Sequence, residues 1–202
     1  MTLRDIKRIV TILEDHVNTE QQALIEDLKK HVLASSVVSS DHFWSRQRAN
    51  PVVALTDLAH AEALLGFPLP SLLKRIYTEV GNGGFGPGYG LFPLINEEDP
   101  QTHWTDSLVT TYLMYRALTP EQFAEYWDEK EDEYQLRAWP EKLIMICDWG
   151  CNIYSYLDCS QPECPVLHLD HNLPVRKLEL EASSLHQWLE NWLTKVAPGK
   201  AK

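Results

Sequence analysis

The chain has 202 residues, a formal net charge of −11 and 44% hydrophobic residues, which is ordinary for a soluble globular protein. No apolar run approaches the roughly 20 residues that a membrane span needs, and the charged residues 1–10 lack the apolar core of a secretory signal. We therefore expect a cytoplasmic protein, and the acidic balance disfavours direct binding to a nucleic-acid backbone.

The first predicted element is a helix over residues 3–33, where apolar residues recur with a period of 3.6 around a polar break at 18–22. A serine-rich stretch at 34–51 predicts a linker. We accordingly expect three parts: a helical N-terminal extension over 1–48, a domain over 49–197, and a disordered tail over 198–202.

Two short helices are predicted next. Thr56 is a candidate N-cap for the first, which the sequence "GFPLP" then ends. Pro70 suits the first position of the second helix, which is expected to run to about Val80. Gly81 is placed to end that helix as the residue after its C-cap.

The sequence "GNGGFGPGYG", residues 81–90, holds six of the nine glycines. A phosphate-binding loop would need a following Lys and Ser or Thr, and a dinucleotide loop would join a strand to a helix; neither holds here. We predict a compact turn that feeds a strand over 90–95. At least one of Gly81, Asn82, Gly83 and Gly84 should have a positive φ, and no anion should bind there.

A helix over 106–118 precedes a capping box formed by Thr119 and Gln122, with Pro120 as the first helical residue. Residues 97–133 hold eleven acids and two bases, which leaves −9 of the −11 charges in this segment. The segment predicts a basic protein partner, because opposite fields steer association; a solvated helix face explains the acids equally well. The candidate partner-binding residues are Glu97, Glu98, Asp99, Trp104, Glu125, Trp127, Asp128, Glu129, Glu131, Asp132 and Glu133.

Four short segments rich in apolar and β-branched residues follow, at 142–147, 152–158, 165–169 and 175–180. They predict an antiparallel meander. A final helix is expected to begin at Ser183. The order of elements predicts an α+β fold with a single mixed, largely antiparallel sheet flanked by helices.

The chain offers little chemistry. The four cysteines lack the paired spacing of a zinc site, and His168 and His171 are not expected to share a face of a strand, so we expect no metal site and no cofactor. No nucleophile motif is present, which predicts a protein that is not an enzyme.

Two aspartates and three tryptophans are the remaining candidates. Asp148 and Asp158 flank a strand as turn formers or as an acid and a base, and the turn reading is favoured. Trp149, Trp188 and Trp192 lie in patterned segments and are expected in the core.

Residues 59–94, "AHAEALLGFPLPSLLKRIYTEVGNGGFGPGYGLFPL", resemble the SUKH superfamily. The likeness extends more loosely over about 50–196, through "YLD" and a final helix with "SSLHQWLENWL". The residues that carry the motif are Glu62, Gly66, Leu69, Pro70, Tyr77, Asn82, Gly83, Gly84 and Asp158.

The resemblance implies an α+β fold and a role in binding other proteins. The superfamily includes the yeast cell-wall-synthesis regulator and many bacterial immunity proteins, which neutralise a cognate toxin, commonly a nuclease. The expected function is therefore a non-catalytic immunity protein that covers the basic face of a toxin. The alternative is a regulatory scaffold without a toxin partner.

Overall fold

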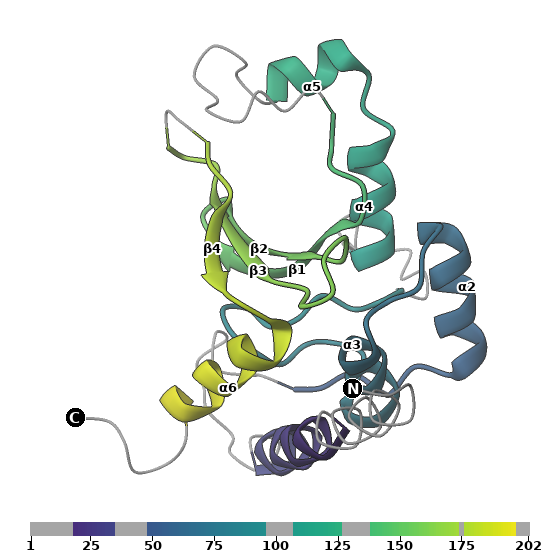
Figure 1. Ribbon diagram of the computed structural model, residues 1–202, viewed down its shortest axis with the longest axis vertical. Helices are drawn as coiled ribbons and strands as arrows, with labels where there is room; N and C mark the ends of the chain where they lie inside the picture. The colour runs from purple at the N-terminus through teal and green to yellow at the C-terminus, as the bar shows by residue number, and fades with distance from the viewer. Residues whose placement is uncertain (1–17, 35–47, 96–106, 127–137, 174–175, 197–202) are drawn as a thin grey trace, which may run out of the picture.

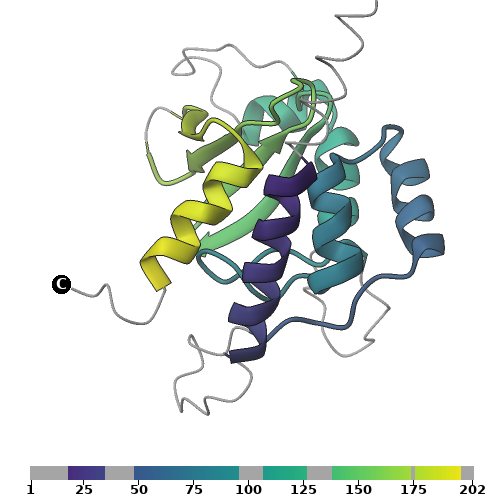
Figure 2. The same ribbon diagram turned by 60° about the horizontal axis from the view of Figure 1, so that its bottom comes forward.

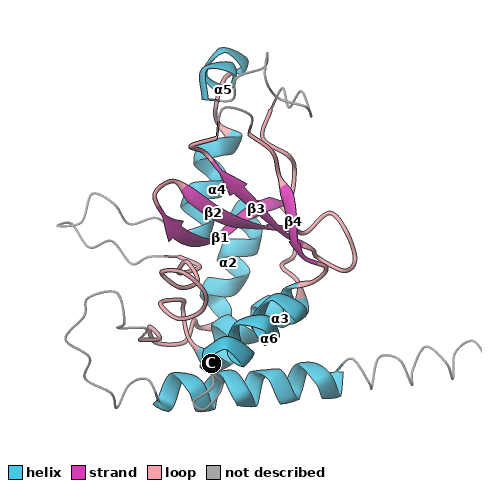
Figure 3. Cartoon of the chain, turned by 90° about the vertical axis from the view of Figure 1, so that its left-hand side faces the viewer, coloured by secondary structure: helices cyan, strands magenta, loops and turns pink. Residues whose placement is uncertain are grey.

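The computed structural model describes residues 18–34, 48–95, 107–126, 138–173 and 176–196. The fold is α+β, as predicted: a four-stranded sheet lies between α4 and α5 on one side and α3, α6 and an N-terminal helix on the other (Figures 1 and 3). No helix in these ranges is both long and apolar enough to cross a membrane. The elements are α2 (Leu55–Leu65), α3 (Ser71–Arg75), the π-helix η2 (Ile76–Val80), α4 (Leu108–Arg116), α5 (Pro120–Tyr126), β1 (Leu143–Gly150), β2 (Ile153–Asp158), β3 (Val166–Asp170), β4 (Glu179–Ala182) and α6 (Leu185–Val196).

The sheet is the predicted meander, with the strand order β1-β2-β3-β4 and every neighbouring pair antiparallel. Leu157 pairs with Ile144 on one side and with Val166 on the other, and all three side chains are buried. All pairs among the described strands are thus antiparallel. The sequence predicted a mixed sheet, but no parallel pair is present among these strands. The fourth strand lies a few residues later than the predicted 175–180.

The strand predicted over 90–95 is wrong: only Leu91 forms a bridge, to Cys147 of β1. The Phe92 N–H donates to the Ile146 carbonyl at 3.0 Å, but Pro93 has no N–H to continue the ladder. The Leu94 N–H donates instead to the Asn82 side chain at 2.6 Å. The glycine-rich segment therefore runs along β1 as a loop.

The N-terminal helix is continuous over residues 18–34, so the predicted break at 18–22 is wrong, while 1–17 lie outside the described residues. Leu24, Ile25 and Leu28 are buried in the core. The helix lies beside α6 and α3 (Figure 2), where His31 makes an edge contact with Trp192 at a ring distance of 4.8 Å. This apolar face supplies the stabilisation that overrides the polar residues at the helix start.

The helix ends follow local hydrogen bonding. The predicted cap at Thr56 is wrong, because α2 begins after Ala54 with no side-chain cap. The capping box is confirmed: the Gln122 N–H donates to Thr119 Oγ1 at 3.2 Å, and the Thr119 N–H donates to Gln122 Oε1 at 3.0 Å. Helix α6 begins two residues after the predicted Ser183, because the Gln187 N–H donates to Ser184 Oγ at 3.1 Å.

The helix predicted to end at Val80 widens in its last turn into η2. The Gly81 N–H donates to the Ile76 carbonyl at 3.0 Å, a bond that spans one residue more than in an α-helix. Gly81 ends the helix, but as its C-cap and not as the predicted residue after the C-cap, and its φ of 167° is extended rather than left-handed.

Candidate functional site

The first motif turn is built around Glu62 in α2. Its backbone carbonyl accepts from Gly66, which has a φ of 80°. Its side-chain Oε1 accepts from the Leu69 N–H at 2.7 Å and pairs with Lys74 Nζ at 3.4 Å. One glutamate therefore ends α2 and fixes the start of α3. Pro70 is the N-cap of α3 and not its first helical residue as predicted, because its ψ of 142° is extended and the helix begins at Ser71.

Tyr77 connects η2 to the loop beside the sheet. Its fully buried hydroxyl donates to the Phe92 carbonyl at 2.8 Å. Burial raises the pKa of Tyr77 well above its ordinary value, so the phenol stays a neutral donor. Its role is structural, because the group has no open space around it.

Asn82 acts as a clamp between two loop segments. Its side chain accepts from the Leu94 N–H at 2.6 Å and donates to the Ile95 carbonyl at 3.1 Å. Its own carbonyl accepts from Asn50 Nδ2 at 2.9 Å. An amide suits this position because it offers a donor and an acceptor at once.

The predicted positive φ is confirmed at Gly83 (70°) and Gly84 (81°). The Gly84 N–H donates to the Leu91 carbonyl and the Leu91 N–H donates to the Phe85 carbonyl, at 2.9 and 2.8 Å. A Cβ added at Gly83 would lie 2.7 Å from the Phe92 carbonyl carbon. These amides are used inside the turn, which supports a structural role for the glycines; the absence of an anion there stays a prediction.

The two aspartates are turn formers in the structure. Asp148 Oδ1 accepts from the Gly150 N–H at 2.6 Å, and Asp158 Oδ1 accepts from the Ser160 N–H at 2.9 Å. Asp158 closes the turn that follows β2, whereas the Asp148 bond spans the irregularity near the end of β1, between Asp148 and Gly150. Both carboxylates hold the local backbone, in line with the favoured reading from the sequence.

The histidines lie in different settings. His168 lies in β3 opposite Ser155, whereas His171 follows the strand and its Nε2 lies 3.2 Å from the Tyr156 hydroxyl. Burial, with a smaller contribution from Arg176, lowers the pKa of His171 to about 4, so this ring is neutral at pH 7. Within the described ranges, no group of three His, Cys, Asp or Glu side chains is placed to hold a metal ion.

The acidic candidates cannot be located in space. Glu125 belongs to α5, but its side chain lies outside the described part of the molecule. The other ten are in residues 96–106 and 127–137, which are also outside it. The remaining members of this group are Glu97, Glu98, Asp99, Trp104, Trp127, Asp128, Glu129, Glu131, Asp132 and Glu133.

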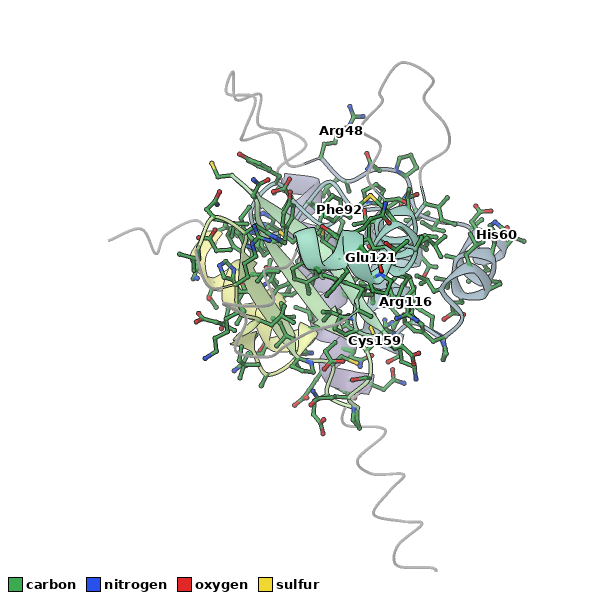
Figure 4. All side chains as sticks on the ribbon, turned by 90° about the horizontal axis from the view of Figure 1, so that it is seen from above. Arg48, His60, Phe92, Arg116, Glu121 and Cys159 are labelled. Atoms are coloured by element: carbon green, nitrogen blue, oxygen red, sulfur yellow. The ribbon has the colours of Figure 1, made fainter. Side chains whose placement is uncertain are left out.

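The residues next to these acidic segments are firmly held. Phe123 of α5 is buried, and Trp139 stacks on Tyr115 with their rings 4.3 Å apart. Arg116 Nη1 donates to the Trp139 carbonyl at 2.7 Å. Figure 4 looks down on α4 and α5, with Arg116 and Glu121 labelled on these helices. In the sequence, one acidic segment precedes α4 and the other follows α5, and these two helices lie on the side of the sheet away from α6.

One expectation for the tryptophans is wrong. Trp188 and Trp192 are buried, but the Trp149 side chain is 39% exposed. Trp149 lies near the end of β1, where the ladder has a shift between Asp148 and Gly150. That irregularity turns the side chain outward, and the apolar pattern of the strand does not reveal it.

Comparison with known proteins gives one clear result. The model of the SMI1 / KNR4 family (SUKH-1) matches residues 53–191, a range that includes every motif residue described above and the whole sheet. No curated protein matches the chain closely enough to count as a relative.

Proposed function

The chain belongs to the SMI1 / KNR4 family (SUKH-1), and from that premise we propose that it is a bacterial immunity protein. Membership supports a protein-interaction or immunity-type module. The proposal goes further: the chain acts in the cytoplasm without catalysis and neutralises a cognate toxin, most naturally a nuclease. The motif residues support the same reading, because Glu62, Tyr77 and Asn82 form internal hydrogen bonds that hold the fold.

The observation that carries the proposal is the position of the charge along the chain. Residues 97–133 contain −9 of the −11 formal charges, and both acid-rich stretches adjoin α4 and α5. A nuclease needs a basic face to hold phosphates. Carboxylates opposite such a face raise the association rate and penalise neutral or acidic partners.

The mechanism is blockade of the toxin's substrate-binding face. The acids neutralise the cations that would hold the nucleic acid, and Trp104 and Trp127 supply apolar anchors of the kind that dominate binding energies. Inhibition then needs no chemical step, only a complex that is stable while the toxin is present.

The test is binding to a toxin domain encoded beside this chain. We expect the combined change of Glu129, Asp132 and Glu133→Lys to lower affinity by at least about tenfold, mainly through a slower association rate that becomes less dependent on salt. Surface plasmon resonance at two salt concentrations measures both effects.

The matched control changes three exposed acids outside the segment, Asp57, Glu163 and Glu179→Lys, and alters the net charge equally. An equal loss with both variants would contradict a specific acidic interface. If the chain binds no neighbouring toxin and protects no cell from one, the regulatory scaffold is the better function.

A further inference from the structure

A hollow of about 260 Å³ opens beside the glycine-rich turn, on the α6 side of the sheet. Three regions far apart in sequence form it: the turn, the end of β1, and β4 with the adjoining α6. We call it the tryptophan hollow. Its main lining residues are Pro87, Trp149, Glu181, Trp188, Trp192 and Lys195.

Hydrogen bonds fix the walls of the tryptophan hollow. Trp149 Nε1 donates to Ser155 Oγ at 2.7 Å, and this fully buried hydroxyl donates to Glu181 Oε2 at 2.6 Å. Trp188 Nε1 donates to the other carboxylate oxygen, Oε1, at 2.7 Å. Two indole rings and one carboxylate are therefore held in place before anything binds, which lowers the entropic cost of binding.

The glycine-rich turn forms one wall because it lies very close to β1. A Cβ added at Gly88 would lie 2.5 Å from the Asp148 carbonyl oxygen, so only glycine permits this approach. Cys147 Sγ donates to the Pro87 carbonyl at 3.1 Å and ties the same wall to the strand.

We propose that the tryptophan hollow binds a cationic Lys or Arg side chain of a protein partner. Indole faces attract cations, and the Glu181 carboxylate supplies a formal opposite charge inside the same hollow. The apolar walls suit the methylene stem of such a side chain. The indole of Trp149 is the one that an incoming cation can reach more easily, because Trp149 is 39% exposed whereas Trp188 is only 3% exposed.

The charges around α6 also favour a basic occupant. On the other flank of α6, a second hollow lies against the N-terminal helix and is lined by Glu20, Asp27 and Glu190. Asn191 lines both hollows. A basic segment crossing α6 at Asn191 would thus place one cation on the indoles and the next among carboxylates.

Lys195 works against this occupant. It lines the tryptophan hollow and is exposed, so its ammonium competes with an incoming cation for Glu181. Its flexible stem lets the charge turn toward solvent. Removal of the Lys195 charge should therefore tighten binding of a cationic side chain. For a purely apolar occupant, no such gain is expected.

This proposal shares one assumption with the proposed function, namely that the partner is basic. The residues of the tryptophan hollow all lie outside 97–133. The probe is a tetra-arginine peptide, with the tetra-citrulline peptide as its uncharged isostere. The full chain is labelled with ¹⁵N, and the indole N–H signals of Trp149 and Trp188 are followed during titration.

We expect tetra-arginine to shift both signals and tetra-citrulline to leave them in place. Glu181→Gln keeps an acceptor for Trp188 and should weaken binding about tenfold, as should Trp149→Leu. Lys195→Gln should tighten it several-fold. Glu163→Gln removes one exposed acid elsewhere and should change nothing; backbone amide spectra check that each variant is folded.

Equal weakening by Glu181→Gln and Glu163→Gln would overturn the proposal, since it would show attraction to net charge alone. Equal shifts with the citrulline peptide would overturn it in favour of an apolar occupant. The change of Glu129, Asp132 and Glu133→Lys separates this site from the proposed function. It should lower the affinity for the toxin by at least about tenfold if that function is right, yet leave the peptide-induced indole shifts in place.

Discussion

At the scale of single residues, the motif works through backbone contacts and internal hydrogen bonds. Glu62 closes one turn, Asn82 clamps another, and Gly83 allows two backbone segments to approach closely. None of these roles needs a ligand. They explain why this combination of residue types identifies a fold, while partner recognition depends on other side chains.

The two glycines with similar φ angles provide a test of this view. Gly66 has a φ of 80° and no atom within 4 Å of an added Cβ, so Gly66→Ala should cost about 1 kcal/mol through backbone strain alone. Gly83→Ala adds a clash with the 91–92 backbone, and we expect a cost of about 3 kcal/mol or more. Urea unfolding of both variants measures the difference. Equal costs would mean that the backbone relaxes around Gly83 and that the close approach is not required.

Some single-residue features could be predicted from the sequence, and others could not. Glycine and asparagine have few structural uses at such a density, so the turn at 81–84 followed from their conformational freedom. The exposure of Trp149 did not, because it depends on a shift in strand pairing that no local pattern encodes. Neither did the approach of Glu181 to Ser155, which brings β4 to β2 across an intervening strand.

At the scale of elements, a helix was predictable where its apolar face and its cap agreed. Both were present in α5, where Thr119 and Gln122 form the capping box around a buried Phe123. At α2, Thr56 has the right residue type, yet the helix starts one residue beyond Ala54. The strand predicted at 90–95 does not form, because Pro93 has no N–H to donate and the Leu94 N–H donates to the Asn82 side chain instead of to β1.

These two threonines form a matched pair. Thr119→Ala removes a side-chain cap and should destabilise α5 by about 1 kcal/mol. Thr56→Ala removes no cap and should change the stability of α2 by less than about 0.5 kcal/mol. Hydrogen exchange of the amides in each helix reports these local effects. A larger loss of protection in α2 than in α5 would show that the assigned caps are wrong.

At the scale of the whole molecule, the N-terminal helix belongs to the same core as the sheet domain. The sequence predicted an extension over 1–48, and periodicity alone could not show whether it packs on the rest. In the structure, residues 18–34 bury their apolar face, and Lys29 Nζ lies 3.4 Å from Glu79 Oε2 of η2. The position of a domain boundary at residue 48 stays a prediction.

If this helix is integral, a cavity in it should destabilise the entire domain. Ile25 is fully buried, so Ile25→Ala should cost about 2–5 kcal/mol. Leu33 is 70% exposed in the same helix, and Leu33→Ala should stay within about 0.5 kcal/mol. Tryptophan fluorescence and far-ultraviolet circular dichroism during urea unfolding should give one coincident transition for each variant. An early separate transition for Ile25→Ala would show that the helix is an independent unit.

The two edges of the sheet differ in what protects them from other chains. The glycine-rich turn lies along β1 and uses the hydrogen-bonding groups of Ile146 and Asp148 there. No described strand pairs with the far side of β4, which carries an exposed Leu180 between Glu179 and Glu181. Glu179 is exposed on this edge, and the like charges of two copies there oppose strand addition. High salt or acid, which weaken that repulsion, would make β4 the place where copies of this protein first associate.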